Sequence, residues 1–270
     1  MPFFGDIALL NPKGTVALAE LGLMLHAIEF MLIVAVPVIF LLFFFAWRYR
    51  ASNKKAKYMP DWENAKMDEL VWWAIPFEIV LILGALTWSS THQLDPKKPL
   101  EGGAPMIVQV VALDWKWLFI YPDRNIATVN YLEVPVGHPV HFEVTADAPM
   151  NSFWIPKLGG QIYAMTGMVT NLNLAATEAG TYPGASANYS GAGFAQMKFN
   201  VQAVPQEDFD AWVRTVQSSQ DTLTPDAYQL LRQPATSGEL YYGGIANNLF
   251  ENIVMSFMGS TPDHVHTHTD

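Results

Sequence analysis

A Ser- and Gly-rich stretch, residues 186–197, places hydroxyl, amide and thioether side chains at short spacing. A transition metal that passes electrons favours soft ligands, and a pair of copper ions needs bridging thiolates. Ser186 and Ser190 offer only hydroxyls, which stay protonated at neutral pH, and Phe194 offers no lone pair. Met197 alone is a weak thioether ligand. The stretch therefore predicts no copper centre. The simplest interpretation is a Gly- and Ser-rich loop that closes a β-domain.

The absence of cysteine from the whole sequence narrows the chemistry further. It removes disulfides, cysteine-based zinc sites, iron–sulfur clusters and thiol catalysis. It also removes the acylated residue of a lipoprotein. The net charge of -10 argues against a nucleic-acid partner, because nucleic-acid binding favours clustered Lys and Arg.

Two histidines, His138 and His141, are spaced closely enough to be considered as a metal pair. They flank a predicted strand start, where residues three apart point to opposite faces. We therefore expect both at the surface rather than on one ion. His26 and His92 fall at predicted membrane boundaries, where an amphipathic ring is well accommodated.

Two apolar stretches, residues 25–47 and 70–88, are long enough to cross a membrane. The sequence is 51% apolar, and these residues concentrate in its first third. About 20 helical residues span a hydrocarbon core of ~30 Å. Pro37 lies inside the first stretch, as membrane helices tolerate. The sequence therefore predicts a two-helix transmembrane hairpin.

The loop between these spans, residues 48–69, holds six of the fifteen Lys and Arg residues. The positive-inside rule places such a loop in the cytoplasm. Residues 1–24 and everything after the second span then lie on the opposite side. The segment 1–24 has neither a basic n-region nor a small-residue cleavage site, so no secretory signal is predicted.

Two carboxylates belong to the second span. Glu69 opens it at the predicted cytoplasmic edge, where the helix dipole favours an acid by about 0.3–1 kcal/mol. Glu78 lies nine residues further along, roughly 13 Å deeper at about 1.5 Å per residue. A carboxylate at that depth costs about 2.5–3.5 kcal/mol on insertion scales. We therefore interpret Glu78 as a candidate intramembrane contact with a partner helix.

A linker at residues 89–104 leads to residues 105–203, which are predicted to form strands. Apolar and polar side chains alternate in several runs that Gly, Pro and Asn separate. Alternation with a period of two residues, interrupted by such turns, predicts an antiparallel sandwich. About 100 residues with loops at one end are typical of a cupredoxin-like Greek key. The aromatic run from Trp115 to Tyr121 fits the core of this sandwich.

Residues 204–259 change to helical periodicity and predict a C-terminal helical extension. Pro205 begins one helix, and Thr224 followed by Pro225 is an N-cap signature. The apolar repeats are Phe209, Trp212, Val213 and Val216 in the first helix and Ile245, Leu249, Ile253 and Phe257 in the last. We expect the extension to pack on the sandwich or on a partner. Residues 260–270, with three histidines, are expected to be a disordered tail.

The spacing of the 186–197 loop resembles the copper loop in subunit II of the haem–copper oxidases. That loop reads Cys-x-Glu-x-Cys-x3-His-x2-Met and holds the binuclear CuA centre. The corresponding residues here are Ser186, Asn188, Ser190, Phe194 and Met197. Only the methionine keeps its type. A further ligand in that family is a His in a His-Ser-Phe-x-x-Pro context, and here Asn151 takes its place. The sequence is therefore similar to the quinol oxidase branch, whose subunit II resembles a copper domain without copper.

This resemblance extends from Ala8 to about Met258. Its most specific stretches are residues 47–54, 114–122, 150–156 and 161–165. Relatives in the quinol oxidase branch often begin with a lipid-attached Cys, which would fall near Gly5. The present sequence departs from that pattern.

The resemblance implies a terminal oxidase that oxidises membrane quinol, reduces oxygen to water and pumps protons. Haems and CuB are expected in subunit I, while this chain is expected to be a non-catalytic assembly subunit with no cofactor. Its implied partners are subunit I, the other subunits, lipid and, through the complex, quinol. The implied location is the bacterial inner membrane, with both termini and the sandwich in the periplasm. Glu69 matches a Glu near the entrance of the K proton pathway and is a candidate for proton entry.

The sequence also allows two other interpretations. One is a copper-bearing cytochrome c oxidase subunit II, in which the aromatic run would lie on the electron path. The missing thiolates argue directly against it. The other is a membrane-anchored periplasmic binding module, which predicts a well-formed ligand pocket in the sandwich.

Overall fold

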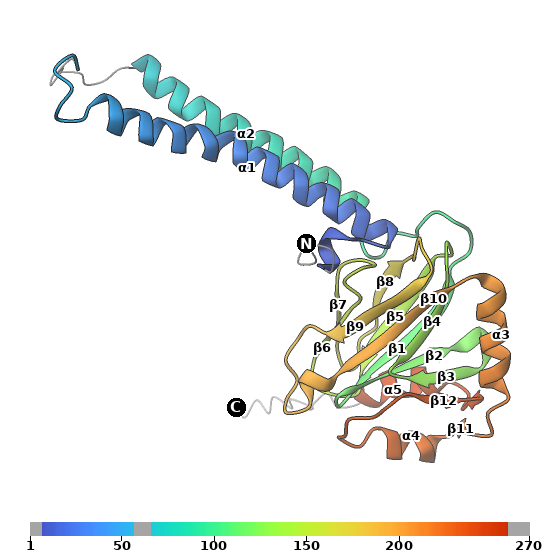
Figure 1. Ribbon diagram of the computed structural model, residues 1–270. Coiled ribbons are helices and arrows are strands. Elements are labelled where there is room, and N and C mark those ends of the chain that lie inside the picture. The colour runs from blue at the N-terminus through green and yellow to red at the C-terminus, as the bar shows by residue number, and fades with distance from the viewer. Residues whose placement is uncertain (1–6, 57–65, 259–270) are drawn as a thin grey trace, which may run out of the picture. The chain divides into compact units, whose positions relative to one another are not determined.

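The computed structural model describes residues 7–56 and 66–258 (Figure 1). It divides the chain into two compact units. One is a two-helix unit at Glu20–Asp95, and the other combines Met1–Ala19 with Pro96–Asp270 in a globular unit. The tail at 260–270 and the N-terminal position near Gly5 lie outside the described residues.

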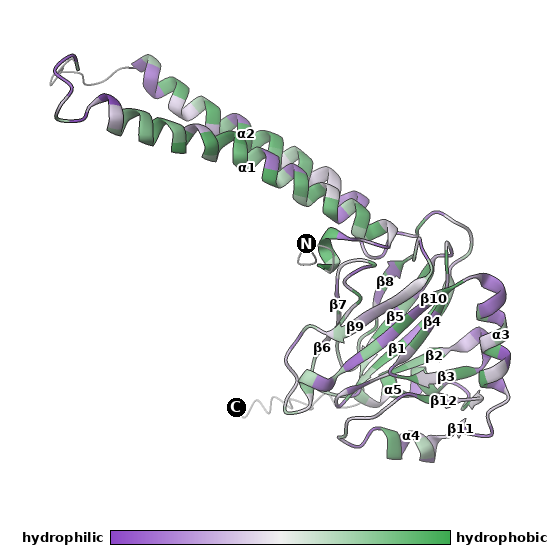
Figure 2. Cartoon of the chain, in the orientation of Figure 1, coloured by the Kyte–Doolittle hydropathy of each residue, from purple (hydrophilic) through white to green (hydrophobic). Residues whose placement is uncertain are grey.

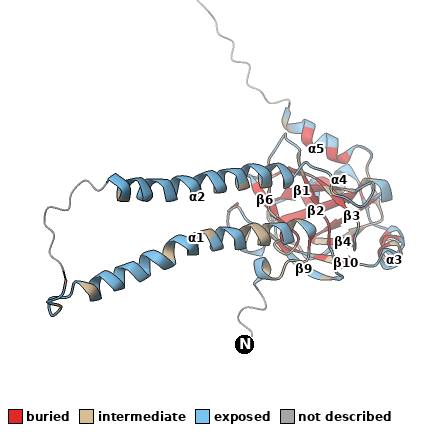
Figure 3. Cartoon of the chain, turned by 90° about the horizontal axis from the view of Figure 1, so that it is seen from above, coloured by how far each residue is buried: buried red, intermediate tan, exposed pale blue. Residues whose placement is uncertain are grey.

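The two-helix unit consists of α1 (Thr15–Arg48) and α2 (Lys66–Gln93), which are long and apolar enough to cross a membrane. Their side chains are largely exposed, and apolar residues surround both helices along most of their length (Figures 2 and 3). A helix that is apolar all round suits a lipid or protein surround rather than water. Both helices extend beyond the predicted spans, because the sequence remains helix-forming on either side of the most apolar stretch. The membrane boundaries themselves remain a prediction.

The first turn of α1 belongs to the globular unit, although the sequence placed it in a segment before the first span. Ahead of it lies a short 3-10 helix, η1 (Ala8–Leu10). The Lys13 backbone N–H donates to Lys157 O at 2.7 Å, and the Ala17 N–H donates to Leu158 O at 3.2 Å. A Cβ on Gly14 would lie 2.3 Å from that Leu158 oxygen, so only glycine allows this approach. The N-terminal segment is therefore fixed to the sandwich.

Two sheets form the sandwich within the described residues. The first has six strands in the order β12-β3-β2-β1-β5-β8, and the second has five in the order β4-β10-β9-β6-β7. The strands of the first sheet are β1 (Met106–Leu113), β2 (Lys116–Tyr121), β3 (Ile126–Val129), β5 (Val140–Ala146), β8 (Thr170–Leu174) and β12 (Leu240–Tyr242). Those of the second are β4 (Tyr131–Pro135), β6 (Asn151–Trp154), β7 (Ile162–Ala164), β9 (Gly180–Ser186) and β10 (Lys198–Val204).

Most neighbouring strands are antiparallel, as the alternation predicted, but two pairs are parallel. These pairs are β1 with β5 and β4 with β10. The chain crosses between the two sheets instead of forming only hairpins, which brings non-consecutive strands together in the same direction. The expectation of a purely antiparallel sandwich is therefore wrong at these two pairs, while the two-layer architecture is confirmed.

An aromatic core fills the space between the sheets. Trp117, Phe119 and Tyr121 of β2 are all buried. Trp117 and Phe119 meet Phe153 and Phe199 from the facing sheet, while Tyr121 meets Phe209 and Trp212. The Phe153 and Phe199 rings stack with centroids 5.3 Å apart, and Trp117 meets Phe153 edge-on at 5.4 Å. Such ring pairs contribute about 0.5–1.5 kcal/mol each beyond area burial. The interpretation of the aromatic run as core is correct for these three β2 residues.

The outer face of the first sheet is also buried, because the C-terminal extension covers it. Leu118 and Ile120 of β2 pack against a second cluster that includes Tyr228 and Phe250. The extension contains α3 (Gln206–Gln217), β11 (Thr222–Leu223), α4 (Pro225–Leu231), β13 (Gly244–Ile245) and α5 (Leu249–Met258). The extension was expected to pack on the sandwich or on a partner, and the structure shows that it packs on the sandwich.

The local signals in the extension were mostly correct. Thr224 caps α4, since its Oγ1 accepts from the Ala227 backbone N–H at 3.2 Å. The apolar face of α3 is buried as expected. Ile245 was wrongly assigned to the last helix, because it pairs in β13 with β11 before α5 begins at Leu249.

Candidate functional site

Three segments bring the loop residues together at one end of the sandwich. Asn151 begins β6, Ser186 ends β9, and the loop between β9 and β10 contains η3 (Phe194–Gln196) before returning to Met197. Asn151 and Met197 are buried to 1% exposure or less, and Ser186 and Ser190 are also buried. Folding thus gathers side chains that are far apart in sequence into one small site, which we call the 186–197 loop site.

Neutral hydrogen bonds fill this loop site. Ser186 Oγ donates to Asn151 Oδ1 at 2.9 Å, and the Asn151 amide donates to Pro149 O at 2.7 Å. The Asn188 amide, half-buried, donates to Met150 O at 3.0 Å. Because buried polar groups are costly when unpaired, these bonds stabilise the loop in the absence of an ion.

The remaining three positions, Ser190, Phe194 and Met197, make other kinds of contact. Ser190 Oγ lies 3.9 Å from Met197 Sδ, a weak contact of a hydroxyl with a thioether. Phe194 is half-buried and places its ring edge-on against Tyr189, with centroids 5.6 Å apart. Aromatic packing therefore occupies the position where a ligand would be needed.

Trp115 fixes the loop from the other sheet, a role that the sequence did not indicate. It lies in the turn between β1 and β2 with a φ of 63°, outside the strand alternation assumed for it. Its indole Nε1 donates to Ser190 O at 3.1 Å. A Cβ on Gly193 would lie 2.3 Å from the Trp115 ring. The sequence signal for this contact was the pair Gly191 and Gly193, since a Cβ at either position would meet the Trp115 ring.

A buried carboxylate, also missed from the sequence, ties this end of the sandwich to the extension. Asp147 accepts from the Tyr228 hydroxyl at 2.6 Å and from an Arg232 guanidinium nitrogen at 2.7 Å. Burial raises the pKa of Tyr228, and the neighbouring Asp147 adds to that rise. Asp147 lies four residues before Asn151, the residue at which β6 begins.

The donor set does not fit a binuclear copper centre. Among Asn151, Ser186, Asn188, Ser190, Phe194 and Met197, no side chain supplies a thiolate or an imidazole. Across residues 7–56 and 66–258, no group of three or more His, Cys, Asp or Glu residues lies close enough to hold a metal ion.

The histidines proposed as surface residues are both half-buried in the structure. His141 on β5 shares a hydrogen bond between its Nδ1 and Asn173 Oδ1 at 2.8 Å, which the surface interpretation did not anticipate. His138 precedes β5 and faces a pocket. His26 and His92 are exposed on α1 and α2, each bonded to a carbonyl of its own helix.

The two carboxylates of α2 lie in different parts of the helix. Glu69 is in the first turn and Glu78 is well inside, and both are exposed in the isolated chain. Nine residues of helix place them roughly 13 Å apart along the axis. The structure keeps them separate from the 186–197 loop site in sequence and in structural unit.

The family model for the periplasmic domain of cytochrome c oxidase subunit II matches residues 120–204. A cytochrome bo(3) ubiquinol oxidase subunit 2 of Pseudomonas putida is 48% identical over 268 residues, covering 96% of this chain and 85% of that protein. A ubiquinol oxidase subunit 2 of Acetobacter aceti is 46% identical over 255 residues, covering 93% and 83%.

Among solved structures, the periplasmic domain of subunit II of cytochrome oxidase from Bradyrhizobium japonicum is 22% identical. It covers 43% of this chain and 96% of that domain, with a TM-score of 0.41. The full-length relatives are far more similar and extend over the helices, the sandwich and the extension alike. The chain therefore belongs to the ubiquinol oxidase subunit 2 family.

Proposed function

We propose that this chain is subunit II of a haem–copper oxidase that takes electrons from membrane quinol and reduces oxygen to water. The observation that carries the proposal is the 186–197 loop site, where neutral amide, hydroxyl and aromatic groups occupy all but one of the ligand positions. A domain with this donor set has no redox group with which to receive an electron. The names of the relatives at 46–48% identity support a quinol-oxidising complex.

In this proposal the haems and CuB belong to subunit I, and the present chain completes the assembly. Its apolar helices, exposed in the isolated chain, supply a surface for subunit I and for lipid. The direct test is affinity purification of the tagged chain from detergent-solubilised membranes. We expect a haem-bearing polypeptide to co-purify in fixed stoichiometry and to show a reducible haem spectrum. A chain that purifies alone, without haem, would refute the assignment.

We further propose that both termini and the sandwich lie in the periplasm of a bacterial inner membrane. The basic loop around Arg48 and Arg50 supports a cytoplasmic location for the connection. The natural absence of cysteine allows a clean test by thiol labelling in intact cells. We expect Ser52→Cys to be protected from an impermeant reagent and Ser237→Cys to be labelled, and the reverse pattern would exclude this topology.

Glu69 is proposed as a proton-entry group at the cytoplasmic edge of the membrane. Oxygen reduction draws protons from that side, and an exposed carboxylate in the first turn of α2 suits their collection. We expect Glu69→Ala to slow turnover several-fold at normal haem content. Asp68→Ala, in the same helical turn, is the matched control and should leave turnover close to wild type. Unchanged turnover of Glu69→Ala from about pH 6 to about pH 9 would leave only a helix-capping role.

Glu78 is proposed as a contact with subunit I inside the membrane. A carboxylate within an apolar helix needs a partner, and the chain itself leaves this side chain exposed. We expect Glu78→Ala to reduce the amount of assembled complex more than the turnover of each complex. Normal assembly of this variant would show that the side chain has no such partner.

A further inference from the structure

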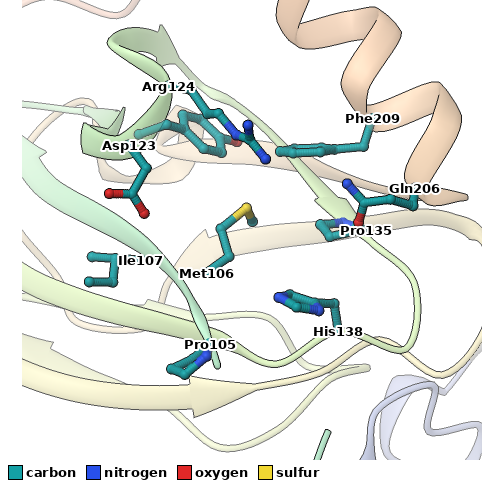
Figure 4. A pocket seen from close by; sticks show the side chains of 10 residues that line it. Pro105, Met106, Ile107, Asp123, Arg124, Pro135, His138, Gln206 and Phe209 are labelled. Carbon is teal, nitrogen blue, oxygen red and sulfur yellow. The ribbon is translucent and has the colours of Figure 1, made fainter. Parts of the chain in front are cut away.

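A second polar site lies at the end of the sandwich opposite the 186–197 loop site. Four segments meet there: the start of β1, the β2–β3 turn, the β4–β5 turn and the start of α3. They enclose a pocket of about 250 Å³ (Figure 4). Pockets for drug-sized ligands measure about 300–1,000 Å³, so this one suits a compact chemical group.

Three ionisable side chains surround this pocket, namely Asp123, Arg124 and His138. Within the described residues, neither Asp123 nor His138 makes a side-chain hydrogen bond or ion pair. The Arg124 guanidinium has one distant ion pair, 3.9 Å from Asp210. An arginine presents five N–H donors in a planar fork, so most of its donors remain available.

The backbone that carries these groups is held in place. Arg124 lies in a 3-10 turn, η2 (Pro122–Arg124), which ends at Asn125 in the left-handed region with a φ of 53°. The Gln217 side chain of α3 donates to Arg124 O at 2.8 Å. Tyr121 lines the pocket from inside and has its hydroxyl bonded to Glu133 O at 2.9 Å. The charged groups are thus presented by a fixed frame, which lowers the entropy cost of binding.

The arrangement of charge indicates the ligand class. A simple anion would be attracted by Arg124 and repelled by Asp123, and a simple cation would meet the opposite problem. A compact zwitterion satisfies both, with phosphate oxygens on Arg124 and His138 and an ammonium group on Asp123. Met106 and Phe209 supply apolar walls for the short carbon linker between the two charges. We propose that this pocket binds a compact zwitterion that carries a phosphate and a primary ammonium.

Such a group has two sources, a free phosphate ester or the headgroup of an amine-bearing phospholipid. The two segments that lead into the membrane-type helices are fixed to this same end of the sandwich. The Asn173 N–H and its side-chain amide donate to Pro96 O at 3.2 and 3.0 Å, and Thr177 donates through its backbone to Lys13 O at 2.8 Å.

The test uses the full chain in non-ionic detergent and isothermal titration calorimetry. Glycerophosphoethanolamine should bind saturably. Glycerol 3-phosphate lacks the ammonium group and ethanolamine lacks the phosphate, so each should bind at least about tenfold more weakly. Arg124→Gln and Asp123→Asn should each weaken glycerophosphoethanolamine binding by roughly tenfold or more. Arg214→Gln, an exposed arginine elsewhere on α3, is the matched control and should bind like wild type.

Nanodiscs then distinguish the source. If a lipid headgroup is the ligand, phosphatidylethanolamine in the disc should occupy the pocket. Binding of glycerophosphoethanolamine should then be lost in phosphatidylethanolamine discs and retained in phosphatidylcholine discs. If a free ester is the ligand, binding should be equal in both. The absence of saturable binding, or equal binding by wild type, Arg124→Gln and Asp123→Asn, would overturn the proposal.

Discussion

The two ends of the sandwich place polar side chains in opposite situations. At the 186–197 loop site, Asn151, Ser186 and Asn188 bond to one another or to backbone carbonyls, and Asp147 is paired close by. At the other end, Asp123 and His138 face a pocket without a side-chain partner in the described structure. The two ends therefore differ in hydrogen bonding: the polar side chains named at the 186–197 loop site are paired, whereas Asp123 and His138 have no side-chain partner in the described structure.

Restoring the donors should convert the closed end into a copper site, and this is the largest effect that we expect. The variant combines Ser186→Cys and Ser190→Cys with Asn151→His and Phe194→His, while Met197 is retained. Thiolates and imidazoles are the ligands that copper centres use. We expect intense thiolate-to-copper absorption after copper addition, against none for the native chain.

The matched control for this reconstruction keeps the two cysteines and omits the histidines. It should bind copper more weakly and with a different spectrum. A native chain that becomes coloured with copper would contradict the account of the loop site.

Removal of a carboxylate should lower the free energy of unfolding more at the 186–197 loop end than at the pocket end. Asp147→Ala leaves the Tyr228 hydroxyl and the Arg232 guanidinium without their partner in a largely buried place. We expect a loss of about 2–3 kcal/mol in the free energy of unfolding. Asp123→Ala, at the open end, should change it by less than about 0.5 kcal/mol.

Urea unfolding of the full chain in detergent, followed by tryptophan fluorescence, measures both variants. If both variants lost the same free energy of unfolding, the hydrogen-bonded Asp147 would stabilise the fold no more than the unpaired Asp123.

A methyl group added to the loop should cause a comparable or smaller loss in the free energy of unfolding. Gly193→Ala places a Cβ 2.3 Å from the Trp115 ring, so the indole or the loop must move. Overpacking of this kind costs about 1–3 kcal/mol. Gly238→Ala is the matched control, because nothing lies within 4 Å of its added Cβ. If both variants unfold at the same urea concentration, Trp115 does not hold the loop.

Much of the fold was predictable because its signals are local. Apolar length predicted the two helices, alternation predicted the strands, and Thr224 with Pro225 predicted a helix start. Residue types alone predicted that the 186–197 loop lacks the chemistry of a copper site.

The remaining features depend on tertiary contacts that no local pattern encodes. Trp115 leaves the strand alternation because its positive φ lets the indole reach Ser190. Leu118 and Ile120 are buried because an extension from more than a hundred residues later covers them. The pocket around Arg124 combines four segments, and its charged residues look like ordinary surface groups in the sequence.

The choice of electron donor tests the central claim most directly. Steady-state oxygen consumption by the complex purified through this chain should be measured with ubiquinol and, separately, with reduced cytochrome c. Since the side chains of the loop site supply neither a thiolate nor an imidazole to hold a redox-active copper, we predict rapid turnover with ubiquinol and negligible turnover with cytochrome c. Comparable rates with the two donors would contradict it.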